Sequence, residues 1–139
     1  MGATPIRRAY AAYEQDMGLR RIAGAVLRGK ADLSHPLMFG YTRDVVPLLY
    51  NGRKPLAFPP IAYDMPYNYV DKNLLVTGFA DGKELDKLAA TPAMALHRMG
   101  QGKIVLFSHA PNFRAIWIGT ERTYANALFF TQAIDYRKN

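Results

Sequence analysis

The chain has 139 residues, a formal net charge of +7 and a sequence pI of about 9.8, and it contains no cysteine. This length predicts one domain, and the lack of cysteine excludes disulfides, thiolate catalysis and cysteine-bound zinc. No apolar run reaches the length of about 18 residues that a membrane span needs, so no span is expected.

The positive charge taken alone points to an acidic partner such as nucleic acid. The basic residues are scattered along the chain, however, and they do not form the long blocks of like charge that mark an interaction tail. We therefore favour a solvated basic surface, and we keep nucleic-acid binding as an alternative.

The segment 1–21 is expected to be helical, and the core of the single domain (1–139) is expected to span 22–134. Thr4 followed by Pro5 is typical of a helix start, and the helical spacing of apolar residues predicts a helix over 5–17. The segment contains arginines but lacks the apolar stretch of a signal peptide. Either the protein stays where it is made, or the sequence begins after a signal.

Two strands are expected in the first half of the core. The run 22–33 is a strand candidate that Gly24 and Gly29 weaken. Pro36 ends it, because a proline biases the preceding residue away from the helical region. The run 45–50 contains Pro47, which cannot donate a backbone hydrogen bond, so this strand is expected at an edge of the sheet. The proline-rich segment 54–68 follows as a long loop, and long loops are often functional or mobile.

The second half of the core begins with a predicted buried strand at 73–79 and a short helix at 83–90. Two apolar runs, 92–99 and 103–108, are joined by a short segment that contains glycine, which is typical of a β-hairpin. The second run is expected to be a fully buried strand.

A last helix is expected to begin with Thr120 as its N-cap. Its predicted core face consists of residues at helical spacing: Tyr124, Ala127, Leu128, Thr131 and Ile134. Together the elements predict an α/β or α+β domain with helices packed on a mixed β-sheet of about four to six strands.

The loop before the last helix contains the candidate binding residues. It leads from a strand end to a helix N-terminus, which is a natural position for an anion. An arginine in this loop could clamp a carboxylate or a phosphate, or it could donate to loop carbonyls and fix the shape of the loop. The candidates are His109, Asn112, Arg114 and Thr120.

No catalytic or metal-binding set is predicted. The three histidines, His35, His97 and His109, are not paired at the short spacing typical of zinc ligands. Ser108 and His109 are neighbours at a strand end, so their side chains point to opposite faces and cannot easily share a proton. We therefore expect no metal, no cofactor and no catalytic residue.

Several short motifs in the residues 22–132 match a known pattern. They are 34–37 (SHPL), 39–41 (FGY), 73–76 (NLLV) with Gly78, 102–107 (GKIVLF), 111–114 (PNFR), 119–120 (GT) and 126–128 (NAL). Together they resemble the C-terminal segment of large bacterial zinc carboxypeptidase-family proteins. In that family the segment follows the peptidase domain, within a region similar to class I glutamine amidotransferases.

The resemblance implies part of a glutamine amidotransferase-like, flavodoxin-like domain, in a chain that is a fragment of a larger protein. The chain lacks the peptidase's His-x-x-Glu zinc motif and the amidotransferase's cysteine nucleophile. The implied function is a non-catalytic accessory or interaction domain of a zinc carboxypeptidase-like protein, whose parent would be periplasmic or secreted. Its partner would be a second copy of the chain or the peptidase domain. Two alternatives stay open: a small-molecule or peptide-binding module that uses the loop 108–120, and a basic nucleic-acid-binding domain.

Overall fold

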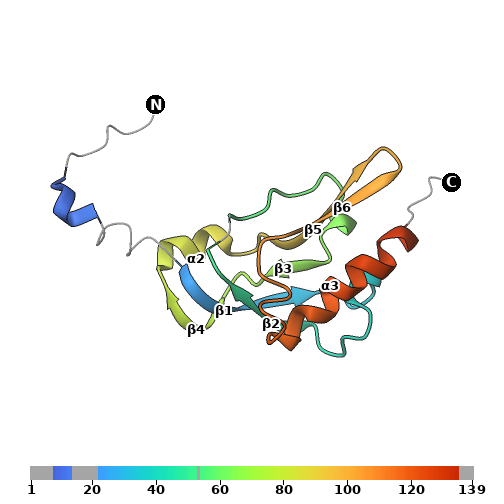
Figure 1. Cartoon of the computed structure of the whole chain (residues 1–139), viewed down its shortest axis with the longest axis horizontal. Coiled ribbons are helices and arrows are strands. Elements are labelled where there is room, and N and C mark those ends of the chain that lie inside the picture. The colour runs from blue at the N-terminus through green and yellow to red at the C-terminus, as the bar shows by residue number, and fades with distance from the viewer. Residues whose placement is uncertain (1–7, 14–21, 53, 135–139) are drawn as a thin grey trace.

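The computed structural model describes residues 8–13, 22–52 and 54–134. This part of the chain combines one six-stranded sheet with two α-helices, which confirms the predicted combination of helices and a sheet (Figure 1). The elements are β1 (Ile22–Ala31), β2 (Val45–Tyr50), β3 (Tyr67–Tyr69), β4 (Leu75–Ala80), α2 (Gly82–Leu88), β5 (Pro92–Met99), β6 (Gly102–Phe107) and α3 (Ile118–Phe130).

The strands run in the order β2-β1-β3-β5-β6, with β4 paired to β1 off this path. Every pairing is antiparallel, so the predicted mixed sheet is wrong. A flavodoxin-like domain has a mainly parallel sheet, so the topology gives no support to that part of the resemblance. The prediction that Pro47 places β2 at an edge is confirmed.

β3 and β4 are two parts of one long path along β1, separated by the excursion 71–73. The backbone N–H of Val70 donates to the carbonyl of Arg28 at 3.2 Å, and the N–H of Arg28 donates to the carbonyl of Leu74 at 2.8 Å. The ladder with β1 therefore continues on both sides of the excursion. This arrangement explains why one strand, β1, has both β3 and β4 as neighbours on the same side.

Two predictions for this region are wrong. The segment 54–68 was expected to be a loop, but β3 begins inside it at Tyr67, and a 3-10 turn (Ala62–Asp64) precedes that strand. The strand at 73–79 was expected to be buried, but Val76 and Phe79 of β4 are 44% and 58% exposed. The four residues 76–79 are all exposed, so both faces of this part of β4 lack a covering layer in the described structure.

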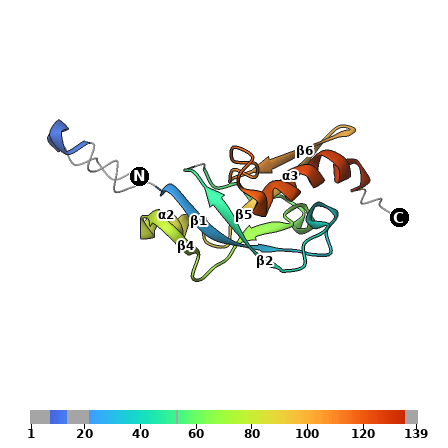
Figure 2. The same cartoon turned by 60° about the horizontal axis from the view of Figure 1, so that its bottom comes forward.

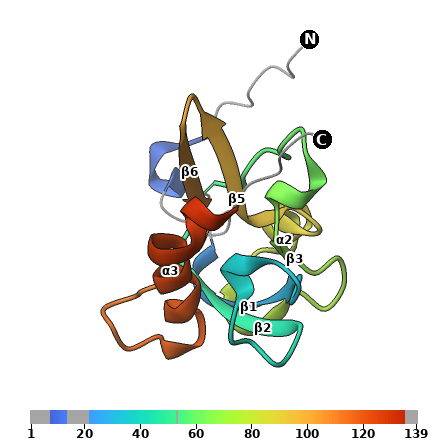
Figure 3. The same cartoon turned by 90° about the vertical axis from the view of Figure 1, so that its right-hand side faces the viewer.

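The core lies against the curled sheet. Leu27, Leu48 and Met94 are fully buried on three different strands, and Leu37 in a 3-10 turn, η2 (Pro36–Met38), is buried with them. The curl brings the chain after β6 back to β2, where the N–H of Ala110 donates to the carbonyl of Leu49 at 3.1 Å. α2 and α3 lie toward opposite ends of the sheet. The turn end of the β5–β6 hairpin extends beyond the other strands (Figures 2 and 3).

The start of α3 differs from the prediction. Trp117, not Thr120, is the N-cap residue, and its side chain makes no capping hydrogen bond. Thr120 lies inside the first turn, where its hydroxyl donates to the carbonyl of Pro111 at 3.0 Å. A threonine can serve either as a cap or as a donor to a nearby carbonyl, and here the preceding loop takes up its hydrogen bond.

The buried face of α3 is also not the predicted one. Tyr124 and Leu128 are 41% and 65% exposed, while Thr120, Thr123 and Asn126 are buried. The cause is the turn beneath the helix, whose carbonyls need donors: the side-chain N–H groups of Asn126 donate to Leu37 at 3.0 Å and to Phe39 at 2.9 Å. The predicted core positions beyond the helix, Thr131 and Ile134, are buried.

Only part of the predicted N-terminal helix 5–17 lies within the described residues. There, Tyr10–Ala12 form a 3-10 turn, and the remainder of the prediction falls outside them. In the described part of the chain no helix combines the length and apolar character needed to cross a membrane.

Candidate functional site

Two of the predicted binding residues are buried structural groups. His109 is fully buried between the rings of Tyr67 and Phe107, at centroid distances of 5.7 and 5.6 Å, and its Nδ1 donates to the carbonyl of Ala93 at 3.1 Å. Thr120 is fully buried as well. Neither side chain is open to a ligand, so both serve the packing of the loop 108–120.

The other two predicted residues are exposed and do not join them. Asn112 lies at one end of a surface groove beside β6. Arg114 has a φ of 53° and places its guanidinium 5.1 Å from the centroid of the Phe113 ring, instead of donating to the loop carbonyls. The structure therefore does not bring His109, Asn112, Arg114 and Thr120 together around one cavity.

A buried polar cluster lies beside His109. The hydroxyls of Tyr69 and Ser108 are 2.9 Å apart, and the hydroxyl of Tyr67 donates to the carbonyl of Val46 at 2.7 Å. Burial raises the pKa of Tyr67 and of Tyr69 well above the usual range, so both hydroxyls stay protonated. The cluster satisfies polar groups in the core and offers no acid or base near neutral pH.

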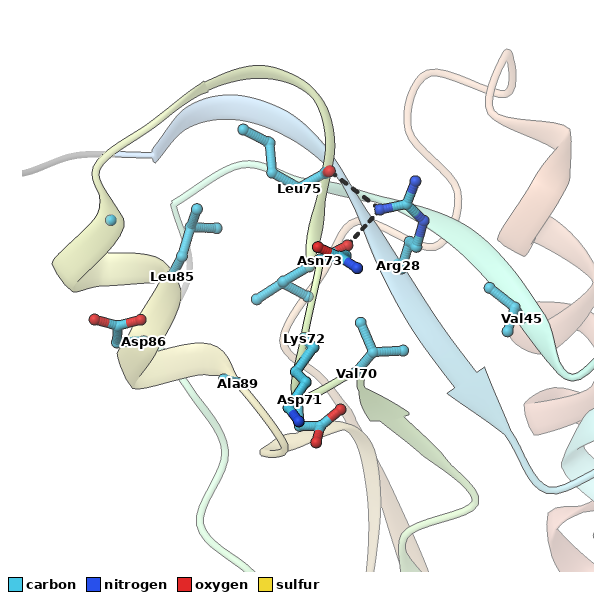
Figure 4. A pocket seen from close by; sticks show the side chains of 12 residues that line it. Arg28, Val45, Val70, Asp71, Lys72, Asn73, Leu75, Leu85, Asp86 and Ala89 are labelled. Atoms are coloured by element: carbon cyan, nitrogen blue, oxygen red, sulfur yellow. Dashed lines mark hydrogen bonds between the residues drawn. The ribbon is translucent and has the colours of Figure 1, made fainter.

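A groove of about 740 Å³ lies at the excursion 71–73, between that segment and α2 (Figure 4). Arg28 reaches into it from β1 and donates to the carbonyl of Asn73 and, at 3.3 Å, to that of Leu75. Asp71 and Asp86 line the same groove together with Arg28 and Lys72, so the acidic and basic side chains balance and favour neither an anion nor a cation. Arg28 therefore has a structural role: by donating to the carbonyls of Asn73 and Leu75 it holds the end of the excursion against β1.

A second groove, of about 510 Å³, lies between β6 and α3, and most of the residues that line it are apolar. Val105, Leu106 and Phe107 form one wall, and Tyr124 forms the other. Leu128 follows Tyr124 by one helical turn on the same face of α3. We call these five residues the β6–α3 surface.

The β6–α3 surface was not predicted as a site from the sequence. Tyr124 and Leu128 were assigned to the core, and the run 103–108 was assigned to a buried strand. The signal was present, because an uninterrupted apolar run is typical of a strand that is covered on both faces. In the structure the side chains of this strand are alternately exposed and half-buried.

The described residues contain no group of three or more His, Cys, Asp or Glu side chains placed to hold a metal ion. Comparison of the chain with protein-family models, with curated proteins and with solved structures finds no match.

Proposed function

We propose that the chain is a non-catalytic interaction domain that binds another polypeptide through the β6–α3 surface. The observation that carries the proposal is the inverted polarity of α3. This helix buries Thr120, Thr123 and Asn126 and exposes Leu128 and Phe129, which are 65% and 78% accessible. A surface helix normally buries its apolar side, and a large exposed apolar patch normally marks an interaction site.

The strand beside the helix supports the same proposal. β6 is the last strand of the sheet on its side, and Ile104 and Leu106 on one of its faces are 38% and 43% exposed. Edge strands of this apolar kind pair readily with another chain unless they are protected. A partner that covers both β6 and α3 would bury apolar surface and satisfy an open strand edge at once.

The resemblance to the C-terminal segment of zinc carboxypeptidase-family proteins suggests the setting of this domain. The partner would then be the peptidase domain of a parent chain or a second copy of the same chain. The two alternatives have less support. The candidate residues of the loop 108–120 do not surround a common cavity, and the exposed surface on β6 and α3 is apolar rather than basic, unlike a phosphate-binding face.

A pair of matched substitutions tests the proposal. Leu128→Lys places a charge in the β6–α3 surface, and Phe79→Lys places the same charge on β4, where the side chain is similarly exposed at 58%. Loss of a buried leucine corresponds to roughly 1.5–3 kcal/mol, so Leu128→Lys should weaken association by about 10- to 100-fold. Phe79→Lys should leave it unchanged.

Association is measured by light scattering and sedimentation, for the chain alone and for the chain mixed with the polypeptide encoded directly upstream of it. Circular dichroism of both variants checks that they are folded. Equal effects of the two substitutions, or no association in either setting at about 100 μM, would contradict the proposal.

A further inference from the structure

The backbone of β6 has a free edge whose polar groups can be assigned from the register. The N–H of Ser108 donates to the carbonyl of Ala93 at 3.0 Å, and Phe107 pairs with Met94. Hydrogen-bonded and non-hydrogen-bonded pairs alternate along an antiparallel ladder. The N–H and C=O groups of Lys103, Val105 and Phe107 therefore point away from β5, where the described residues provide no strand.

The edge strand at the opposite end of the sheet, β2, is protected against pairing with another chain, whereas the edge of β6 is open. β2 contains Pro47, which has no N–H to offer, and the carbonyl of Leu49 already accepts from Ala110 at 3.1 Å. Proline and coverage by a loop are common ways to block an edge strand. In the described residues, β6 has neither form of protection: it contains no proline, and no loop residue is hydrogen-bonded to its outer edge in the way that Ala110 is bonded to β2.

We propose that the occupant of this edge is a second copy of the chain, whose β6 adds antiparallel with a two-fold axis at Val105. The inference rests on the proposed function and names its partner. Val105 then lies opposite Val105 of the other copy, and Lys103 lies opposite Phe107. In this register every outward N–H and C=O of Lys103, Val105 and Phe107 has a partner, because each pair exchanges two hydrogen bonds.

The charge on β6 argues against an axis at Lys103. Lys103 is the only charged side chain on the strand, and its ammonium donates to the carbonyl of Thr131 at 3.1 Å. An axis at Lys103 would place two ammonium groups directly opposite each other, which is destabilising. An axis at Val105 places each Lys103 opposite an apolar ring and leaves its contact with Thr131 in place.

The side chains on both faces fit the same register. Ile104 of one copy lies opposite Leu106 of the other, so four exposed apolar side chains cover one another on that face. On the other face, Val105 lies opposite Val105 of the other copy, beside the groove of about 510 Å³ that Val105, Phe107 and Tyr124 line. A two-fold axis gives each copy the same contacts, as in most homodimers.

The natural lack of cysteine allows a direct test. Val105→Cys should form an intermolecular disulfide under mild oxidation, because facing residues of paired strands lie within the Cα distance that a disulfide spans. Ile104→Cys and Leu106→Cys are the matched controls, since neither faces its own copy in this register. We expect Val105→Cys to cross-link roughly tenfold faster than either control, because the paired strands raise the effective thiol concentration. An equimolar mixture of the two controls should also cross-link, as a heterodimer.

Wild-type protein provides a measurement that does not depend on the folding of a variant. In amide hydrogen exchange followed by NMR, the N–H groups of Lys103, Val105 and Phe107 should become slower to exchange as protein concentration rises. Amides of the exposed strand β4 should not change.

The outcomes separate the inference from the proposed function. Equal cross-linking rates for all three single-cysteine variants would overturn the register and the two-fold pairing. A monomeric chain that still binds the upstream polypeptide, and loses that binding with Leu128→Lys, would overturn the second copy as occupant while the proposed function stands. Absence of both kinds of association would overturn both.

Discussion

His35 is a buried histidine that holds the turn beneath α3. It is 7% exposed, and its Nδ1 accepts the N–H of Leu37 at 3.1 Å, so this cap exists only while Nδ1 is unprotonated. Burial lowers the pKa of His35 below its ordinary value of 6.5, and the nearby carboxylates of Asp32 and Asp64 partly offset the effect. The unfolded chain therefore takes up a proton at a pH at which the folded chain does not.

This difference predicts how stability depends on pH. The contribution of His35 is fully present above pH 6.5 and is lost as the pH falls below 6.5 toward the lowered pKa of the folded state. Each unit of pKa difference corresponds to about 1.4 kcal/mol. His35→Asn, whose side-chain oxygen can also accept the N–H of Leu37, should lose less stability than the wild type between pH 7 and pH 5. Urea denaturation at several pH values measures the difference, and identical pH profiles would rule out this role of His35.

At the scale of a single element, the end of α2 is strained at one residue. Ala90 follows the C-cap residue Ala89 and has a φ of 59°, a conformation that costs a non-glycine residue roughly 1–2 kcal/mol. Helices commonly place glycine at this position. Ala90 is exposed and its methyl group packs into no core, so Ala90→Gly should raise the free energy of unfolding by about 1 kcal/mol.

The neighbouring residue provides the control for this change. Ala89 has a φ of −51°, which alanine adopts readily, so Ala89→Gly should lower stability through the greater entropy of the unfolded chain. Thermal denaturation of the two variants against the wild type gives the comparison. A melting temperature that falls in both variants would contradict the strain at Ala90.

The elements also show what the sequence alone could predict. The β5–β6 hairpin and β2 were predictable because each combines an apolar run with a local signal, a glycine turn or a proline. β3 was missed because three residues, Tyr67–Tyr69, are too short to show a period, and their burial depends on distant strands. The predicted buried face of α3 was wrong because periodicity identifies only the apolar residues of a helix. This helix instead buries Asn126, which donates to carbonyls in and next to η2.

The candidate site was harder to predict than the fold, because the burial of its residues depends on contacts between elements that are distant in the sequence. The position of His109 after a strand was read correctly from the sequence, but its complete burial between Tyr67 and Phe107 depends on how the sheet curls. The apolar run of β6 was also read correctly as a strand, but its predicted burial is wrong, because Ile104 and Leu106 are 38% and 43% exposed. Only the strand order shows that one edge of it is open.

At the scale of the whole molecule, the net charge of +7 sets the response of association to salt. Two copies that meet through an apolar strand repel each other through their net charge, and salt shortens the range of this repulsion to about 10 Å at 0.1 M. The β6–β6 pair contains no opposite charges that salt could weaken, since Lys103 lies opposite Phe107. Self-association should therefore become stronger as sodium chloride rises.

The expected change is about threefold in the dissociation constant between low and near-physiological salt, or roughly 0.6 kcal/mol. Sedimentation velocity over a series of protein concentrations at each salt level measures it, with Leu128→Lys as the variant whose association should be about 10- to 100-fold weaker at each salt level. A nucleic-acid partner would show the opposite slope, because binding to phosphates releases counterions and weakens with salt. Self-association that weakens severalfold with salt would mean that paired charges cross the interface, and the axis at Val105 would then be wrong, because the strand brings no such pair together.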